Sequence, residues 1–167
     1  MKTTFSILIF GLIVLSPMQS FAQQKKDLKV YTGFIGTPNA STIGINLGAE
    51  YFLSNRMSLV SGLAYIDEPN RMFPARDLLF QADFRYYVVN KKLNFYLHTG
   101  YAFHNMQREW PVNDFVTNKN SVSAGMGVEY DLSDKWSVHF NGRSWYNDEG
   151  VFRYFGLGTS FRLNKRD

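Results

Sequence analysis

Apolar and polar residues alternate one by one along several segments of this chain, and this alternation restricts its fold more than any other feature. Over residues 42–53 the apolar positions are Ile43, Ile45, Leu47, Ala49, Tyr51 and Leu53. A period of two is typical of a β-strand, whose successive side chains point to opposite faces of a sheet. The pattern recurs over residues 77–89, 93–103 and 121–130 and, less regularly, over 28–35, 57–66, 136–146 and 151–163. We therefore predict an all-β fold of eight strands, each near the ~9–11 residues of a membrane-spanning strand.

The connections between these segments also alternate in length. Short polar turns, rich in hairpin-turn residues, are predicted at 54–55, 90–92 and 133–134. The other four connections are more variable: 36–41, 67–76, 105–120 and 147–150. Two of them, 67–76 and 105–120, are the longest. Short turns at one end and long loops at the other are typical of membrane barrels. We expect an eight-stranded antiparallel up-and-down transmembrane β-barrel, with both ends of the chain on the side of the short turns.

The first 22 residues have the features of a secretory signal peptide. Lys2 precedes an apolar run over residues 5–15, and Ser20-Phe21-Ala22 supplies the small residues of a cleavage site. This apolar run is too short to cross a hydrocarbon core, which needs about 20 residues. We expect cleavage after Ala22 and export through the periplasm, which leaves residues 23–167 as a single barrel domain.

Composition excludes several other classes of protein. The chain has no cysteine, which excludes a disulfide framework, a thiolate metal site and a lipid-modified N-terminal cysteine. Its net charge of +4 gives no support to nucleic-acid binding. An aromatic content of 17% is far from that of a disordered chain.

Alternation alone does not separate a soluble lipocalin-like barrel from a membrane barrel, so side-chain size and charge must decide. A water-exposed face would be rich in Lys and Glu, but the polar face here is made largely of small residues: Gly44, Gly48, Gly100, Gly125, Gly127, Gly156, Gly158, Ser121, Ser123 and Ser160. The opposite face carries large side chains, with aromatic residues near predicted strand ends: Tyr51, Tyr65, Tyr86, Tyr101, Phe103, Tyr130, Trp136 and Tyr146. Such rings favour the membrane interface. We predict that the apolar face contacts lipid, with the soluble barrel as the alternative.

With this pattern, the chain resembles the small eight-stranded outer-membrane barrels of Gram-negative bacteria, the OmpA/OmpX-like group of the porin family. The most specific piece is Gly158-Thr159-Ser160-Phe161-Arg162-Leu163, which resembles the Gly-x-x-aromatic-x-apolar signal for barrel assembly. Members of the group often end at the aromatic residue, whereas residues 164–167 follow here. The resemblance implies an outer-membrane location, contact with lipid and lipopolysaccharide, and recognition by the barrel-assembly machinery through Gly158, Phe161 and Leu163.

Eight ionisable residues fall on the predicted inner face: Glu50, Asp83, Arg85, His98, Glu129, His139, Arg143 and Arg162. Buried charges are costly unless they are paired. We therefore expect these residues to form a network of ion pairs and hydrogen bonds that plugs the lumen and fixes the strand register. Asp83 and Arg85, two positions apart on one strand, are a candidate pair. A narrow gated pore is the alternative.

The catalytic alternative is a lipid A acyl hydrolase or acyltransferase, because known enzymes of this kind are also eight-stranded barrels. A serine hydrolase needs a nucleophile, a histidine base and an acid, for which Ser137, His139 and Glu129 are candidates. The lipid A deacylase family carries His-x-Ser, but here the triplet is His139-Phe140-Asn141. We therefore assign no catalytic residue.

We also expect no metal and no cofactor, because His98, His104 and His139 show no recognised ligand spacing. The predicted loop 105–120 places Trp110 and Phe115 at the extracellular end, where they could contact an extracellular ligand or pack the loop onto the rim. The sequence thus predicts a non-enzymatic outer-membrane barrel with a plugged polar interior, which contributes to envelope integrity or to surface binding and adhesion.

Overall fold

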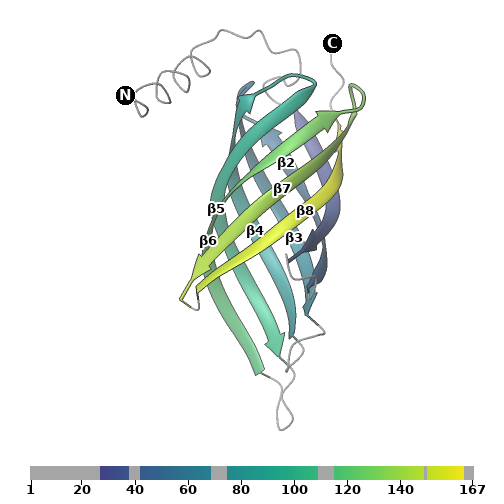
Figure 1. Ribbon diagram of the computed structural model, residues 1–167. Helices are drawn as coiled ribbons and strands as arrows, with labels where there is room; N and C mark the ends of the chain where they lie inside the picture. Colours follow the sequence, from purple (N-terminus) through teal and green to yellow (C-terminus); the bar gives the residue numbers. More distant parts are fainter. Residues whose placement is uncertain (1–26, 38–41, 69–74, 109–114, 149, 164–167) are drawn as a thin grey trace, which may run out of the picture.

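The computed structural model describes residues 27–37, 42–68, 75–108, 115–148 and 150–163, and these form one closed antiparallel β-barrel. Each strand pairs with the next along the chain, and the last pairs with the first (Figure 1). The eight strands are β1 (Leu28–Gly36), β2 (Ile43–Phe52), β3 (Met57–Glu68), β4 (Ala75–Val89), β5 (Leu93–Arg108), β6 (Phe115–Asp131), β7 (Trp136–Asn147) and β8 (Gly150–Arg162). The predicted fold class is confirmed. In the part of the chain that the structure describes, no helix is long and apolar enough to cross a membrane.

The apolar face of the sheet points outward and the polar face points into the barrel. Ile43 and Phe34 expose 68% and 66% of their surface, whereas Glu50 and Glu129 expose 2% and 1%. This is the reverse of a soluble barrel, in which the charged side chains would be outside and the large apolar ones inside. The predicted orientation of the two faces is therefore confirmed.

The three short turns lie at the same end of the barrel, which we call the short-turn end. The hydroxyl oxygen of Ser54 accepts hydrogen bonds from the amides of Arg56 and Met57, and Ser133 does the same for Lys135 and Trp136. These contacts are the local reason why serine favours tight turns. Both ends of the described chain lie at this end too, because Lys29 is paired with Arg162 where β1 meets β8. The predicted positions of the short turns are confirmed.

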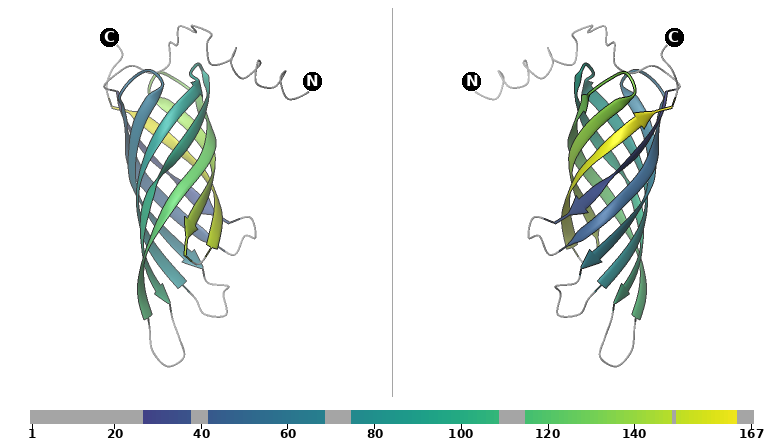
Figure 2. Two further views of the ribbon diagram at one scale, coloured as in Figure 1. Left: turned by 90° about the vertical axis from the view of Figure 1, so that its left-hand side faces the viewer. Right: turned by 90° about the vertical axis from the view of Figure 1, so that its right-hand side faces the viewer.

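At the opposite end, the long-strand end, β5 and β6 project beyond the other strands (Figure 2). They have 16 and 17 residues, against 9 in β1 and 10 in β2. The predicted loop 105–120 was therefore too long, since residues 105–108 belong to β5 and 115–120 to β6. Here the side-chain nitrogen Nδ2 of Asn105 donates a hydrogen bond of 2.8 Å to the side-chain oxygen Oδ1 of Asn118 on the exposed surface. Polar residues occur on both faces of this hairpin extension, Asn105 and Asn118 on the outer face and Thr117 and Lys119 on the inner face, so the alternation that marks the other strands is interrupted. For the same reason Tyr101 and Phe103, predicted near a strand end, lie well inside β5.

Inside the barrel, rings lie against glycines of neighbouring strands. The phenol ring of Tyr96 lies over Gly127, and the imidazole of His139 lies over Gly158, where an added Cβ would meet Nε2 at 2.8 Å. Tyr31 covers Gly48 and Gly62 in the same way. A barrel of eight strands has an interior just wide enough for side chains. The small residues on the inner face thus leave the space that the large inward-facing rings occupy.

This packing gives a stability prediction for Gly127→Val. A Cβ at residue 127 overlaps the ring of Tyr96, which is 1% exposed and lies against Tyr87 and Arg85, so the ring has little room to move aside. Overpacking of this kind costs about 1–3 kcal/mol, so the free energy of unfolding should fall by that amount. Urea unfolding of the barrel in detergent micelles measures it.

The matched control is Ala124→Val, which adds a larger side chain on the exposed outer face of the same strand. We expect its effect to stay within about 0.5 kcal/mol. Equal stability of the two variants would contradict the packing argument.

Candidate functional site: the polar interior of the barrel

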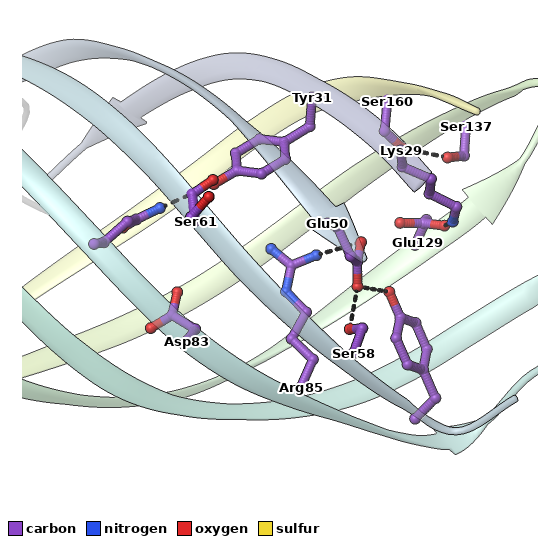
Figure 3. Close-up of polar contacts among 12 residues, drawn as sticks. Lys29, Tyr31, Glu50, Ser58, Ser61, Asp83, Arg85, Glu129, Ser137 and Ser160 are labelled. Atoms are coloured by element: carbon purple, nitrogen blue, oxygen red, sulfur yellow. Dashed lines mark hydrogen bonds and ion pairs between the residues drawn. The ribbon is translucent and has the colours of Figure 1, made fainter. Parts of the chain in front are cut away.

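Glu50 is the centre of the polar network in the half of the barrel near the short turns. Its Oε1 accepts hydrogen bonds from the hydroxyls of Ser58, at 2.5 Å, and Tyr87, at 2.7 Å (Figure 3). Its Oε2 accepts one from Arg85 Nη1 at 3.1 Å. The guanidinium of Arg85 also lies 4.7 Å from the centre of the Tyr96 ring. A buried carboxylate with a cation and two hydroxyl donors is well compensated.

Asp83 is the centre of a second set of contacts, toward the middle of the barrel. Arg143 Nη2 donates to Asp83 Oδ2 and Arg143 Nη1 to Gln81 Oε1, each at 2.6 Å. The hydroxyl of Ser123 adds a bond to Asp83 Oδ1 of 3.1 Å. These contacts join β4, β6 and β7 across the lumen. They form because the barrel is narrow enough for the ends of side chains from different strands to come within hydrogen-bond distance.

Asp83 and Arg85 therefore take different partners, and the expected pairing between them is not the one formed. Residues two apart on a strand stand roughly parallel and point the same way. Their charged ends consequently meet groups from other strands, Arg143 on β7 for Asp83 and Glu50 on β2 for Arg85.

A third set of contacts closes the short-turn end. Lys29 Nζ forms a buried ion pair with Glu129, and Arg162 Nε lies 3.3 Å from Asp27 Oδ2. Lys29 was missed by the sequence analysis, although it shares the inner phase of the first strand with Tyr31. The eight predicted inner-face ionisable residues are all buried in the interior: Glu50, Asp83, Arg85, His98, Glu129, His139, Arg143 and Arg162.

The three hydrolase candidates on this side are not assembled as a nucleophile, base and acid. The hydroxyl of Ser137 lies 2.5 Å from that of Ser160, and the carboxylate of Glu129 pairs with Lys29. The ring of His139 meets the edge of the Tyr31 ring, with 6.0 Å between centres. In this geometry each group is occupied by a packing or pairing contact.

An apolar layer separates the polar network from the long-strand end. It consists of Ile35, Ala64, Ile66, Leu79, Ala102, Trp145 and Tyr154. On either side of Trp145 and Tyr154 there is a small space, one of ≈20 Å³ and one of ≈10 Å³. Each has room for about one water molecule. The larger hollows, of ≈730 and ≈690 Å³, lie on the lipid-facing surface around Ala49, Ser61 and Ala82.

A second polar cluster lies on the other side of the apolar layer, and the sequence analysis missed it. His104 Nδ1 lies 2.6 Å from Asp77 Oδ2, and His104 Nε2 lies 2.7 Å from Ser121 Oγ. The prediction ended the fifth strand at Phe103 and began the loop at Asn105, so His104 was assigned to neither. Continuing the period of two from His98 would have placed His104 on the inner face.

The remaining predicted residues lie at the borders of the barrel. Phe161 packs against Trp136 on the outer face, with 4.9 Å between ring centres, and Leu163 is exposed beside it. Gly158 lies on the inner face. Phe115 is the first residue of β6, and Trp110 lies outside the described residues.

The ion pair at the centre of the network gives a second prediction. Glu50→Leu leaves the buried Arg85 without its carboxylate, and breaking a buried pair in this way costs about 3–5 kcal/mol of stability. The double variant Glu50→Leu/Arg85→Met removes both charges together and should recover a large part of that loss. Denaturant unfolding in micelles compares the three proteins. A double variant no more stable than the single one would show that the pair is not the source of the effect.

Comparison with known proteins supports the fold and does not reach the function. The sequence matches no family model and no curated protein. Among solved structures it is similar to the N-terminal β-barrel domain of OprF from Pseudomonas aeruginosa, with a TM-score of 0.67 and 19% identity over 84% of this chain and 100% of that one. It is also similar to Ail from Yersinia pestis, with a TM-score of 0.62 and 12% identity over 84% and 100% of the two chains. Neisserial surface protein A gives a TM-score of 0.61 and 12% identity over 83% and 95%. The chain thus has the fold of the small eight-stranded transmembrane β-barrels.

Proposed function

We propose that this protein is a sealed barrel of the outer membrane that holds the β5–β6 hairpin extension outside the cell. In this role it contributes to envelope integrity and offers the hairpin, together with Trp110 and Phe115 of the predicted loop, to extracellular partners. The observation that carries the proposal is the pairing of Asn105 with Asn118 and of Gln107 with Val116 beyond the ends of the shorter strands. A hairpin with polar residues on both faces suits water, not lipid.

The outer surface supports the placement in a membrane. Large apolar side chains cover it, and rings lie toward both ends of the strands, with Tyr130 and Trp136 near the short turns and Tyr65 and Tyr146 toward the long-strand end. In bacterial barrels the short turns face the periplasm and the long connections face the outside. The long-strand end is then extracellular.

Two basic residues support contact with lipopolysaccharide at that end. Arg76 and Arg153 are exposed on β4 and β8, toward the long-strand end of each strand. Arginine is well suited to phosphate groups, because its planar head donates two parallel hydrogen bonds. For assembly, the exposed Leu163 and the outward-facing Phe161 leave the proposed recognition segment available to the assembly machinery.

The filled interior supports a role without transport. A solute would have to break the network around Glu50 and Asp83 and then displace the apolar layer around Trp145 and Tyr154. Removing one partner of a buried ion pair costs several kcal/mol, so spontaneous opening of this path is rare. We assign the network near the short turns a structural role, that of fixing register and closing the lumen.

Surface display of the hairpin is testable with single cysteines, because the natural chain has none. Asn118→Cys should react with a membrane-impermeant maleimide on intact cells, since residue 118 is exposed on the extension. Lys92→Cys, in the turn before β5, should react only after the outer membrane is permeabilised. Ala124→Cys, on the lipid-facing surface of β6, is the matched control and should remain unlabelled. Labelling of residue 92 but not of residue 118 on intact cells would reverse the proposed orientation.

Sealing of the lumen is testable in planar lipid bilayers. The purified folded barrel should give no discrete conductance steps in concentrated potassium chloride, because the two layers of its interior leave no continuous aqueous path. Folding of the inserted material is checked by the difference in gel migration between heated and unheated samples. Uniform, repeated conductance steps from folded protein would contradict the sealed barrel.

A further inference from the structure

The cluster beyond the apolar layer has the geometry of an activated serine. Asp77 on β4, His104 on β5 and Ser121 on β6 lie side by side on three consecutive strands, and they expose 5%, 5% and 2% of their surface. The imidazole bridges the carboxylate, at 2.6 Å from Nδ1, and the hydroxyl, at 2.7 Å from Nε2. This order of acid, imidazole and hydroxyl is the arrangement that activates a serine nucleophile.

The carboxylate determines where the ring carries its proton. An ionised carboxylate can only accept a hydrogen bond, so Nδ1 of His104 carries the proton that binds Asp77. In the neutral ring, Nε2 then has a free electron pair and accepts the hydroxyl proton of Ser121. With the neutral ring in this tautomer, the serine is the donor in the 2.7 Å contact, which is the state of a hydroxyl that can lose its proton to a base.

Two further groups at this cluster can stabilise negative charge. The indole N–H of Trp145 is buried and has no hydrogen-bond partner among the described residues, and its ring meets that of His104 with 5.1 Å between centres. Lys119 faces His104 in the register of β5 and β6. Both side chains border the small space of ≈10 Å³ beside His104 and Asp77. An N–H donor and an ammonium group are the kinds of group that stabilise an oxyanion.

Two of the described side chains that border this space toward the long-strand end are long and unbranched. Besides aromatic residues such as Trp145, the space is bordered by Met106 on β5, Lys119 on β6 and Asn147 on β7, which lie toward the long-strand end. Methionine and lysine are unbranched and adopt many rotamers. A small acyl group can reach the cluster when these two side chains move, whereas a long chain meets Trp145.

We propose that Ser121, activated by His104 and Asp77, cleaves small carboxylic esters that enter from the long-strand end. The Ser121 Oγ–carbon bond forms while Nε2 of His104 takes the hydroxyl proton. The ester C–O bond then breaks, and the alcohol leaves with that proton. A water molecule from the small space beside His104 then attacks the acyl carbon and gives a proton to Nε2 of His104. The bond between Ser121 Oγ and the acyl carbon breaks, Oγ takes that proton back, and the acid leaves. This activity goes beyond the proposed display function and does not depend on it.

The test is covalent labelling of the folded barrel with a fluorophosphonate, which reacts with activated serines. We expect one label per chain, located on Ser121 by peptide mass spectrometry, together with slow hydrolysis of p-nitrophenyl acetate. Ser121→Ala should abolish both. Asp77→Asn keeps the side-chain volume but disturbs the tautomer of His104, so the labelling rate should fall at least about tenfold.

Matched controls come from the other side of the apolar layer. Ser123→Ala removes a buried serine of the same strand that is bonded to Asp83, and His139→Ala removes a histidine in contact with Tyr31. Both variants should label like the parent protein. Gel migration of unheated samples confirms folding in each case. If the folded parent protein takes no label on Ser121, the proposal is overturned. An unchanged labelling rate in Asp77→Asn would also overturn it, because the cluster would then have only a structural role.

Discussion

Closure of the sheet is the constraint on which the rest of this structure depends. In lipid every backbone N–H and C=O needs a partner within the protein, and the pairing of β1 with β8 supplies the last row of partners. Closure with eight strands leaves an interior only as wide as the side chains that fill it. The rings of Tyr31 and Tyr96 fit because Gly48 and Gly127 opposite them have no side chains.

The same narrow interior determines how charge is accommodated. The outer face must be apolar, so the polar residues at alternate positions of each strand point into the barrel. There three of the described carboxylates meet a basic side chain: Glu50 meets Arg85, Asp83 meets Arg143 and Glu129 meets Lys29. Pairs of this kind are weak evidence for added stability, but they penalise any shift in register that would leave one charge alone.

The strands were predictable because lipid and lumen impose different residues on alternate positions. That signal ends where the environment becomes the same on both faces, and the prediction accordingly stopped short of residues 105–108 and 115–120. Which residues point inward was also predictable, because it depends only on phase. The partners were not, because the contact of Asp83 with Arg143 depends on the registers of β4, β5, β6 and β7 together. His104 was missed because the alternation ends near it, and Lys29 was missed because the first strand alternates weakly.

The two halves of the interior differ in the kind of base that meets each buried acid. Near the short turns two of the three partners are arginines, Arg85 and Arg143, whose guanidinium stays charged and can only hold a charge in place. Beyond the apolar layer, the partner that the structure shows for Asp77 is the ring of His104. An imidazole, unlike a guanidinium, can donate a hydrogen bond from one ring nitrogen and accept one at the other. Stability alone would be served by an arginine at this point. The choice of histidine, with a serine hydroxyl on its second nitrogen, is what a site for proton transfer requires.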